Sequence, residues 1–544
     1  MFDMSFFTPL KIRLIGFYLF LIIFACLPIW SVELYINQDG SPHLYNAYII
    51  LQLLEDNASF SQIYSLNYVP IPNLSGHWLL MVLLTVFSPF VVTKIFVTFC
   101  FAAFVAAIGW LRWQTVGREG MTTAFLLGAA MAFNWMWFLG FYNFIIGTVG
   151  FAFTLGLYWR WRENLNIYRS LVISLLVIFV YLSHLISFGM LMGSLCILSV
   201  FVSPKFLKRS IVWTFVSFLP VLPLIISYKL ASEAGGGISP VWRNLKNPLS
   251  VSNWILHLQA ADPFQLLSRK AFPFLGFDSN FFAFFSPFLW LTAAFLCLSI
   301  ATWFVLRSNE FPSRRFLPFM ILTVFSIFFW IFAPDDFGKS HGSFLRERVL
   351  LCGLICFVPL FRTDKFPRLR VLAQVFLVFI IIYQTTVLWE YSLNADKIGR
   401  EYLSGTEMIK DSDSFASIVL IENGCRYKAN PLTNVNVLYG IDKNTRIWDN
   451  YELGYYLFPV IARSPSDRQF IFDFRESNAY DLCDPNEQAN EKLALLDSSL
   501  NIHNDKINVM LIWGNDERVE AILRKWFEEE PFFQNKRVRL FRHR

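Results

Sequence analysis

An acidic residue lies directly after the first apolar segment, at the start of a predicted helix. Residues 37–47 read Asn-Gln-Asp-Gly-Ser-Pro-His-Leu-Tyr-Asn-Ala. Ser41 is a favoured N-cap residue and Pro42 a favoured first helical residue, so we expect a helix that lies on the membrane surface. Asp39 would then lie beside the positive end of the helix dipole, which favours its carboxylate form. Such a carboxylate can accept a proton from a hydroxyl group, and it can equally cap the helix and face water.

His43 follows one turn after Asp39. Its imidazole could orient Asp39 or contact a phosphate, and the alternative is an interfacial histidine that hydrogen-bonds to backbone. We predict Asp39 and His43 as the catalytic residues.

A second group of ionisable residues lies in residues 334–348, between two apolar segments. Its members are Asp335, Asp336, Lys339, His341, Arg346 and Arg348. A cation fixed at the membrane surface suits a lipid-linked phosphate, whose charge it would stabilise. On a helix Arg346 and Arg348 point about 200° apart, so at most one faces a common site, and we favour Arg346. Both arginines could instead anchor a helix end to lipid headgroups.

Lys339 and His341 are further candidates for contact with the phosphate. Asp335 and Asp336 could orient sugar hydroxyls, or hold a divalent cation with help from His341. The alternative is a solvated pair of carboxylates at a loop edge, and the predicted site therefore includes no metal.

His184 and Asn143 are polar residues near the ends of apolar segments. Because a polar side chain in lipid needs a partner, His184 could line a cavity or bond to the backbone of a neighbouring helix. Asn143 could contact a substrate or serve only as a polar group of an aromatic hairpin.

The composition indicates that lipid is the solvent for most of the chain. Of 544 residues, 55% are hydrophobic and 16% charged, whereas a soluble domain carries about 25% charged residues. The net charge of +6 is spread over short loops. It therefore gives no footprint for nucleic acid.

About eleven apolar segments are long enough, or nearly so, to cross a bilayer as helices. They are 14–32, 91–111, 122–138, 141–159, 170–187, 188–202, 211–230, 281–306, 316–333, 349–361 and 371–389. Basic residues fall in every second connection, as the positive-inside rule requires of cytoplasmic loops. The N-terminus is therefore predicted to be cytoplasmic, and the polar loops 34–75, 231–280 and 334–348 to lie on the outer face.

This alternation requires that the shorter apolar run 77–87 does not cross, and we predict a juxtamembrane or re-entrant helix there. The glycine-rich loop 231–280 could act as a lid over a lipid-linked substrate or as a plain connector.

The chain divides into a transmembrane domain, 1–391, and a less hydrophobic tail, 392–544. Strand-like runs at 417–421, 509–513 and 538–541, with a helical pattern at 519–528, predict a small extracytoplasmic α/β domain. It lacks a nucleotide-binding loop. Cys425 and Cys483 could pair outside the cytosol, while the other cysteines lie in apolar segments as small hydrophobic residues.

This layout resembles the GT-C superfamily of integral-membrane glycosyltransferases, which includes protein O-mannosyltransferases and bacterial aminoarabinose transferases. The similar features are an acidic residue after the first span, a juxtamembrane helix and the proline-rich return at 68–78. Asp39 to His43 resembles an Asp-Gly-Pro-x-His segment with one residue inserted, and residues 141–147 and 509–514 are also similar to family segments. The resemblance implies a polyprenyl-phosphate sugar donor, an inverting transfer and Asp39 as the base.

The leading hypothesis is therefore a multi-pass inner-membrane glycosyltransferase that acts at the periplasmic face. Its donor would be a polyprenyl-phosphate-linked sugar embedded among membrane lipids, and its acceptor a glycan, a lipid or a protein. One alternative is a transporter or flippase of lipid-linked or small polar substrates, although carriers place ionisable groups near the bilayer midplane. A non-catalytic lipid-binding scaffold is the other alternative.

Overall fold

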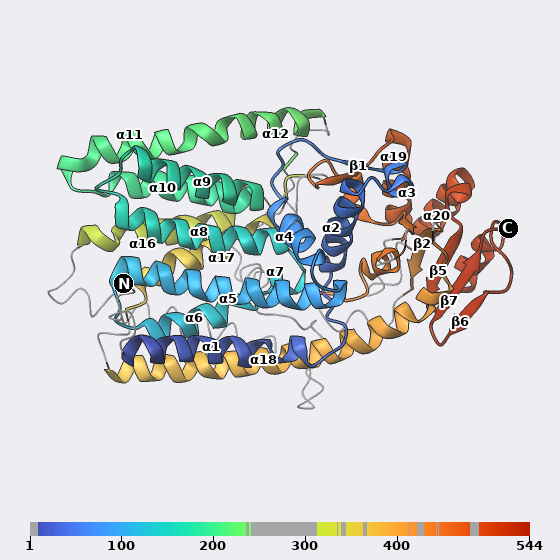
Figure 1. The fold of residues 1–544 in the computed structure, drawn as a ribbon, viewed down its shortest axis with the longest axis horizontal. Helices are drawn as coiled ribbons and strands as arrows, with labels where there is room; N and C mark the ends of the chain where they lie inside the picture. The colour runs from blue at the N-terminus through green and yellow to red at the C-terminus, as the bar shows by residue number, and fades with distance from the viewer. Residues whose placement is uncertain are drawn as a thin grey trace.

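The computed structural model describes residues 9–234, 239–240, 313–334, 336–338, 344–362, 367–411, 413–420, 429–441, 443, 445–478 and 489–544. It is mostly helical, with long helices side by side and a smaller mixed unit at one end (Figure 1). The helices up to residue 234 are α1 (Pro9–Trp30), α2 (Gly40–Leu54), α3 (Ala58–Ser61), α4 (Ser75–Leu84), α5 (Pro89–Val116), α6 (Met121–Ala132), α7 (Trp135–Phe138), α8 (Tyr142–Trp161), α9 (Ile167–Ser183), α10 (Leu185–Val200), α11 (Leu207–Phe218) and α12 (Leu222–Ala234). The later helices are α16 (Ser313–Phe332), α17 (Leu345–Phe357), α18 (Pro367–Tyr402), α19 (Pro465–Asn478), α20 (Ala489–His503) and α21 (Glu517–Leu523).

Four helical stretches among the described residues are long and apolar enough to cross a membrane: Ile12–Trp30, Pro89–Val116, Pro204–Glu233 and Pro367–Met408. Several shorter apolar helices accompany them, among them α6, α9, α10 and most of α16. Their outward faces carry large apolar side chains, such as Ile23, Leu175 and Phe379, which are 65%, 67% and 64% exposed. Such surfaces suit lipid rather than water. The prediction of a membrane-embedded helical protein is confirmed at this level, while the segment 281–306 lies outside the described residues.

Two hairpins differ in detail from the sequence-based expectation. The segment 122–138 is not one helix, because Asn134 ends α6 and its side chain caps α7 by accepting a hydrogen bond from the Trp137 amide. The turn expected at Ser187 and Phe188 lies at His184, which ends α9 and caps α10. A polar residue that can serve as an N-cap thus decides where each helix breaks.

The surface helix predicted after the first span begins earlier than expected and is not a surface helix. It is α2, which begins at Gly40 with Asp39 as its N-cap, rather than at Pro42 with Ser41 as its N-cap. Residues 40–47 are all buried, because α2 packs against α4 on one side and against the tail on the other. The predicted juxtamembrane run 77–87 corresponds to α4, whose ten residues make a helix of about 15 Å, too short to cross a bilayer.

The tail contains the predicted α/β unit. Five strands form a mixed sheet in the order β3-β2-β5-β7-β6. They are β2 (Ser414–Val419), β3 (Arg446–Ile447), β5 (Val509–Trp513), β6 (Phe533–Asn535) and β7 (Val538–Arg542). The three predicted strands correspond to β2, β5 and β7, and the predicted helix to α21. Because α18 continues to Tyr402, the helical part extends past the expected boundary at 391.

The tail is joined to the loop 34–75. Strand β1 (Tyr64–Leu66) of that loop pairs antiparallel with β4 (Val460–Ala462) of the tail. The Tyr45 hydroxyl in α2 also donates to the Thr445 carbonyl over 2.8 Å. Segments some 400 positions apart in sequence therefore form one unit, which covers the start of α2.

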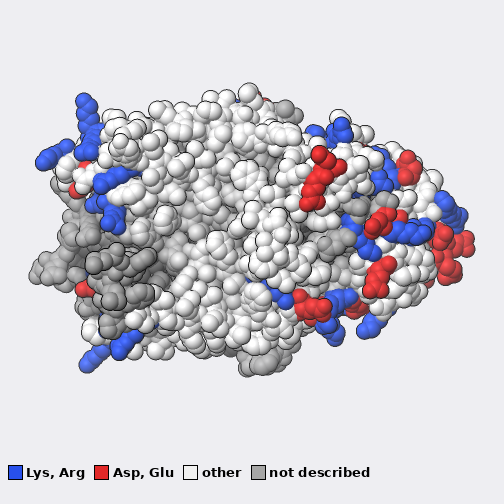
Figure 2. All heavy atoms as spheres, viewed as in Figure 1, with Lys and Arg blue, Asp and Glu red and all other residues white. Residues whose placement is uncertain are grey.

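Charged side chains are absent from the middle of the face shown in Figure 2 and gather at its two ends. Lysine and arginine prevail at the end where the N-terminus lies, whereas both signs are mixed over the tail (Figures 1 and 2). An uncharged band between two charged ends is the pattern that a bilayer imposes.

Candidate functional site

A cavity of about 530 Å³ lies where the apolar helices meet the tail. Six of the residues predicted from sequence line it: Asp39, His43, Asn143, His184, Asp336 and Arg348. The tail supplies further lining residues, namely Thr433, Asn434, Tyr451, Tyr455, Leu457, Phe458 and Arg475. The loop 34–75, the helical hairpins and the tail thus share one site.

Asp39 is held by its backbone and by one tail residue. Its amide donates to the Leu139 carbonyl over 2.9 Å, and the Asn434 amide donates to its Oδ1 over 3.0 Å. The carboxylate makes no capping hydrogen bond to α2, so the simple capping role is not what the structure shows. Burial raises the pKa of Asp39 to about 6, against the opposing charges of His43 and Arg475. The carboxylate form still prevails at neutral pH, and it is more basic than an exposed aspartate.

Two glycines allow the chain segments around Asp39 to approach closely. Gly140, with φ of +77°, lies so near Gly40 that a Cβ on Gly140 would be 2.5 Å from the Gly40 nitrogen. A Cβ on Gly40 would in turn meet the Asn37 and Tyr142 side chains. The α7–α8 hairpin therefore fixes the place of Asp39.

Arg348 is a buried cation without a carboxylate partner among the described residues. Only 7% of it is exposed, and its Nε has no hydrogen-bond partner in that part of the chain. Its guanidinium lies 4.4 Å from the ring centroid of Phe141 and 5.5 Å from that of Phe144. Aromatic faces offset part of the cost of burying a cation, but an anion would offset far more.

His184 lies against Arg348 at one corner of the cavity. Its Nε2 is 2.9 Å from NH1 of Arg348, and its Nδ1 is 3.2 Å from the Ile186 amide, so each ring nitrogen lies next to a donor. An anionic oxygen beside the Arg348 guanidinium would accept from this cation, so this corner of the cavity suits a phosphate.

Arg346, which we favoured for the phosphate, does not line the cavity. Its guanidinium donates to the carbonyls of Trp330 and Ile331 over 2.7 and 2.8 Å, at the end of α16. Such carbonyls lack partners within their own helix, which makes them natural acceptors for an arginine. The two arginines do point apart as the helix geometry requires, but it is Arg348 that faces the cavity.

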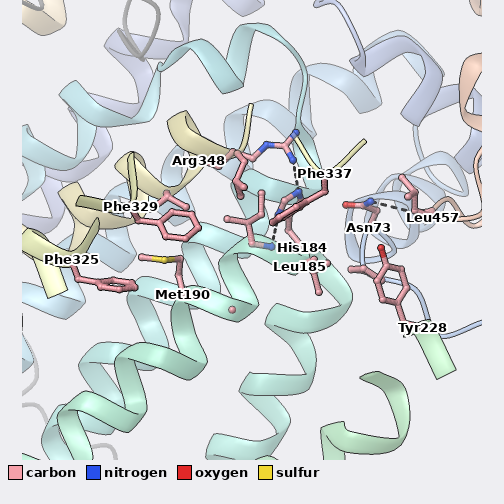
Figure 3. A pocket seen from close by; sticks show the side chains of 15 residues that line it. Asn73, His184, Leu185, Met190, Tyr228, Phe325, Phe329, Phe337, Arg348 and Leu457 are labelled. Atoms are coloured by element: carbon pink, nitrogen blue, oxygen red, sulfur yellow. Dashed lines mark hydrogen bonds between the residues drawn. The ribbon is translucent and has the colours of Figure 1, made fainter. Parts of the chain in front are cut away.

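An apolar pocket of about 340 Å³ adjoins the polar cavity. Figure 3 shows Phe325, Phe329 and Met190 on one side of it, with Arg348 and His184 beyond them. His184, Arg348, Asn73 and Leu457 line both spaces. A ligand with a charged group at this boundary could therefore extend an apolar chain between α10 and α16.

His43 lines the cavity, but its Nδ1 is directed at the buried Glu452. That nitrogen lies 2.7 Å from Oε1 of Glu452, and Nε2 of His77 lies 3.0 Å from Oε2. Two imidazoles and a carboxylate are a set of side chains that could hold a metal ion. From the sequence, His77 was predicted only as the start of the juxtamembrane run 77–87, and Glu452 was not predicted as a site residue.

Of the remaining predicted residues, some line the cavity and others lie outside the described residues. Asp336 lines the cavity, with its Oδ1 accepting from the Gly338 amide over 3.0 Å, and Asn143 accepts from the Gly76 amide over 2.7 Å. Asp335, Lys339 and His341 lie outside the described residues, as do Cys425, Cys483 and most of loop 231–280. The divalent cation considered as an alternative at Asp335 and Asp336 is therefore not tested by the described residues.

The tail residues of the cavity could not have been found from sequence pattern. The Arg475 guanidinium donates to the Tyr455 hydroxyl over 3.0 Å and lies 4.7 Å from the Tyr451 ring centroid. Their nearest signal is the aromatic run 451–458, which is as typical of a core as of a site.

No protein-family model matches this chain, and a search of curated proteins found none similar to it. Its function is therefore inferred from the chemistry of the cavity.

Proposed function

We propose that this protein is a membrane glycosyltransferase that moves a sugar from a polyprenyl-phosphate carrier to an acceptor hydroxyl. The observation that supports this most is that one cavity holds a basic carboxylate, Asp39, and a buried cation, Arg348, which has no carboxylate partner among the described residues, next to an apolar pocket. A lipid-linked sugar phosphate has three parts that such a site could bind: an apolar chain, an anionic phosphate and a polar sugar ring.

In the proposed reaction Asp39 accepts the proton of the acceptor hydroxyl as its oxygen attacks the anomeric carbon. The bond between that carbon and the phosphate oxygen breaks, and its electron pair leaves with the polyprenyl phosphate. Arg348, with His184 beside it, stabilises the charge that develops on this leaving group. Attack from the side opposite the phosphate would invert the anomeric centre.

The proposal includes a GT-C-like membrane domain of about eleven spans. By the positive-inside rule, the N-terminal end with its prevailing basic residues faces the cytoplasm (Figure 2). The cavity and the tail then lie on the periplasmic face of the inner membrane. Lipid-linked donors embedded in the outer leaflet could reach the apolar pocket from there.

This orientation is testable by cysteine labelling. Cysteines replacing the exposed Lys208, beside the basic turn before α11, and Ile502, in α20 of the tail, should react with a membrane-impermeant maleimide from opposite sides. The labelling uses cells whose outer membrane has been opened while the inner membrane stays sealed. There we expect Ile502→Cys to label at once and Lys208→Cys to label only after lysis. Labelling of both before lysis would contradict the orientation.

The apolar pocket can be tested with two glycines of α10. A Cβ would meet nothing within 4 Å at Gly189 or at Gly193, but only Gly189 lines the apolar pocket. We expect Gly189→Leu to raise the KM for a long-chain donor at least about tenfold, because the loss of a few buried methylenes costs about 0.8 kcal/mol each. The KM for a short-chain donor analogue should change little.

Gly193→Leu is the matched control, since it adds the same side chain one turn away. Replacing a helical glycine stabilises a helix by up to about 1 kcal/mol, so neither variant should unfold. Equal effects of the two substitutions on the long-chain donor would exclude this pocket as the site of the prenyl chain.

The reaction itself is tested in proteoliposomes with a panel of polyprenyl-phosphate-linked sugars and candidate acceptors. We expect a covalent glycosylated product and equimolar free polyprenyl phosphate. Movement of the lipid-linked sugar between leaflets without any covalent product would instead identify a flippase.

A further inference from the structure

Three side chains from distant parts of the chain converge behind the wall of the cavity. His43 comes from α2, His77 from α4 and Glu452 from the short 3-10 helix η10 (Tyr451–Gly454). All three are buried, and Glu452 and His77 are 0% exposed. The Nδ1 of His43 and the Nε2 of His77 lie 3.1 Å apart, and each lies within 3.0 Å of one oxygen of Glu452.

The outer nitrogen of His77 is held by the backbone, on the side away from Glu452. His77 uses Nδ1–H to donate to the Asn73 carbonyl over 2.9 Å, which leaves a lone pair on the Nε2 of a neutral ring. Histidine ligands of metal ions typically hold their outer N–H on a backbone carbonyl in this way.

Glu452 faces both imidazoles from the tail. Its buried Oε1 lies 2.7 Å from the Nδ1 of His43, and its Oε2 lies 3.0 Å from the Nε2 of His77. Its Oε2 also accepts from the Asn46 amide, which in turn accepts from Asn450. Two imidazole nitrogens and a carboxylate thus meet in one buried cluster, a set of side chains that could hold a metal ion.

We propose that His43, His77 and Glu452 bind a divalent transition metal ion, for which Zn²⁺ is the best fit. Two imidazoles and one carboxylate form a ligand set that Zn²⁺ favours, whereas Mg²⁺ and Ca²⁺ prefer oxygen ligands. Ligands about 2.1 Å from a tetrahedral zinc ion lie about 3.4 Å apart. The separations of 2.7, 3.0 and 3.1 Å are shorter by less than an ångström. A water molecule would complete the coordination.

The ion would connect the loop 34–75, α4 and the tail, and so hold the start of α2, where Asp39 lies. It acts on the site by positioning, since the Asp39 carboxylate is not one of the ligands. The metal site does not depend on the proposed sugar transfer, because its tests measure metal content and stability.

The test uses the full chain in detergent, purified without chelator. Mass spectrometry of the metals should find about one zinc ion per chain, as expected for a buried site with nitrogen and oxygen ligands. Chelation should lower the Tm, and added Zn²⁺ but not Mg²⁺ should restore it. Glu452→Gln, which keeps the shape of the side chain, should lose bound zinc and the response of Tm to zinc. Asn46→Ala, which removes only the hydrogen bond to Glu452, should weaken zinc binding roughly 10–100-fold.

His503→Ala is the matched control, since His503 lies in α20 away from the cluster, and it should keep the zinc. Folding of Glu452→Gln is checked by its elution volume and its cooperative unfolding. A wild-type chain with no transition metal and no change in Tm on zinc addition would overturn the proposal, because protons would then hold the cluster. Loss of zinc from His503→Ala as well as from Glu452→Gln would do the same.

Discussion

Asp39→Asn should reduce sugar transfer about 10²–10⁴-fold, the contribution typical of a general base. Asparagine has the same shape and its carbonyl oxygen can still accept from Asn434, so the side chain should stay in place. It cannot take the proton of the acceptor hydroxyl at neutral pH. The turnover number should therefore fall while the affinity for the donor remains, as measured by initial rates and by equilibrium binding of the donor.

Asp56→Asn provides the control at the other end of the same helix. Asp56 is exposed and has φ of +57°, a conformation that asparagine tolerates well. It removes the same charge from α2 without changing the cavity, and its turnover should match that of the wild type. An Asp39→Asn protein that transfers sugar at the normal rate would remove Asp39 from the mechanism.

Arg348→Gln should lower kcat/KM roughly 10²–10³-fold, because the charge on the departing phosphate would lose its main partner. The substitution removes a buried cation that has no carboxylate partner among the described residues, so thermal stability should change little or rise. Measuring kcat/KM and thermal stability together separates a role of Arg348 in phosphate binding from a role in folding.

Arg346→Gln, two residues away on α17, should show the opposite pattern. It removes the hydrogen bonds to the Trp330 and Ile331 carbonyls, which should cost about 1–3 kcal/mol of stability. The KM for the donor should stay near the wild-type value. If Arg346→Gln impaired the donor and Arg348→Gln did not, the assignment of the two arginines would be reversed.

Local structure could be predicted from the sequence where the residues of a single helix or strand form a recognisable pattern. Alternating and apolar runs identified β2, β5 and β7, and a carboxylate just after an apolar segment identified Asp39 as a candidate. The short run at α4 was predicted not to span because its length alone excludes that.

Other features depend on contacts that no local pattern encodes. Arg346 and Arg348 are equivalent in sequence, and the start of α17 after Phe344, which has φ of +58°, sets which of them faces the cavity. Glu452 lies 375 positions from His77, and long-range contacts such as the pairing of β1 with β4 bring the two elements together. The surface position predicted for α2 was wrong because its second apolar contact is with the tail rather than with lipid.

Binding of polyprenyl phosphate and of the matching uncharged polyprenol, compared by native mass spectrometry, tests the central claim most directly, since it needs no knowledge of the sugar or acceptor. We predict that the phosphate form binds the wild-type protein at least about tenfold more tightly, a difference of 1.4 kcal/mol. Arg348→Gln should abolish this preference while retaining the weaker binding of both lipids. Equal binding of the two lipids to the wild type would contradict a phosphate site at Arg348, and with it the proposed donor.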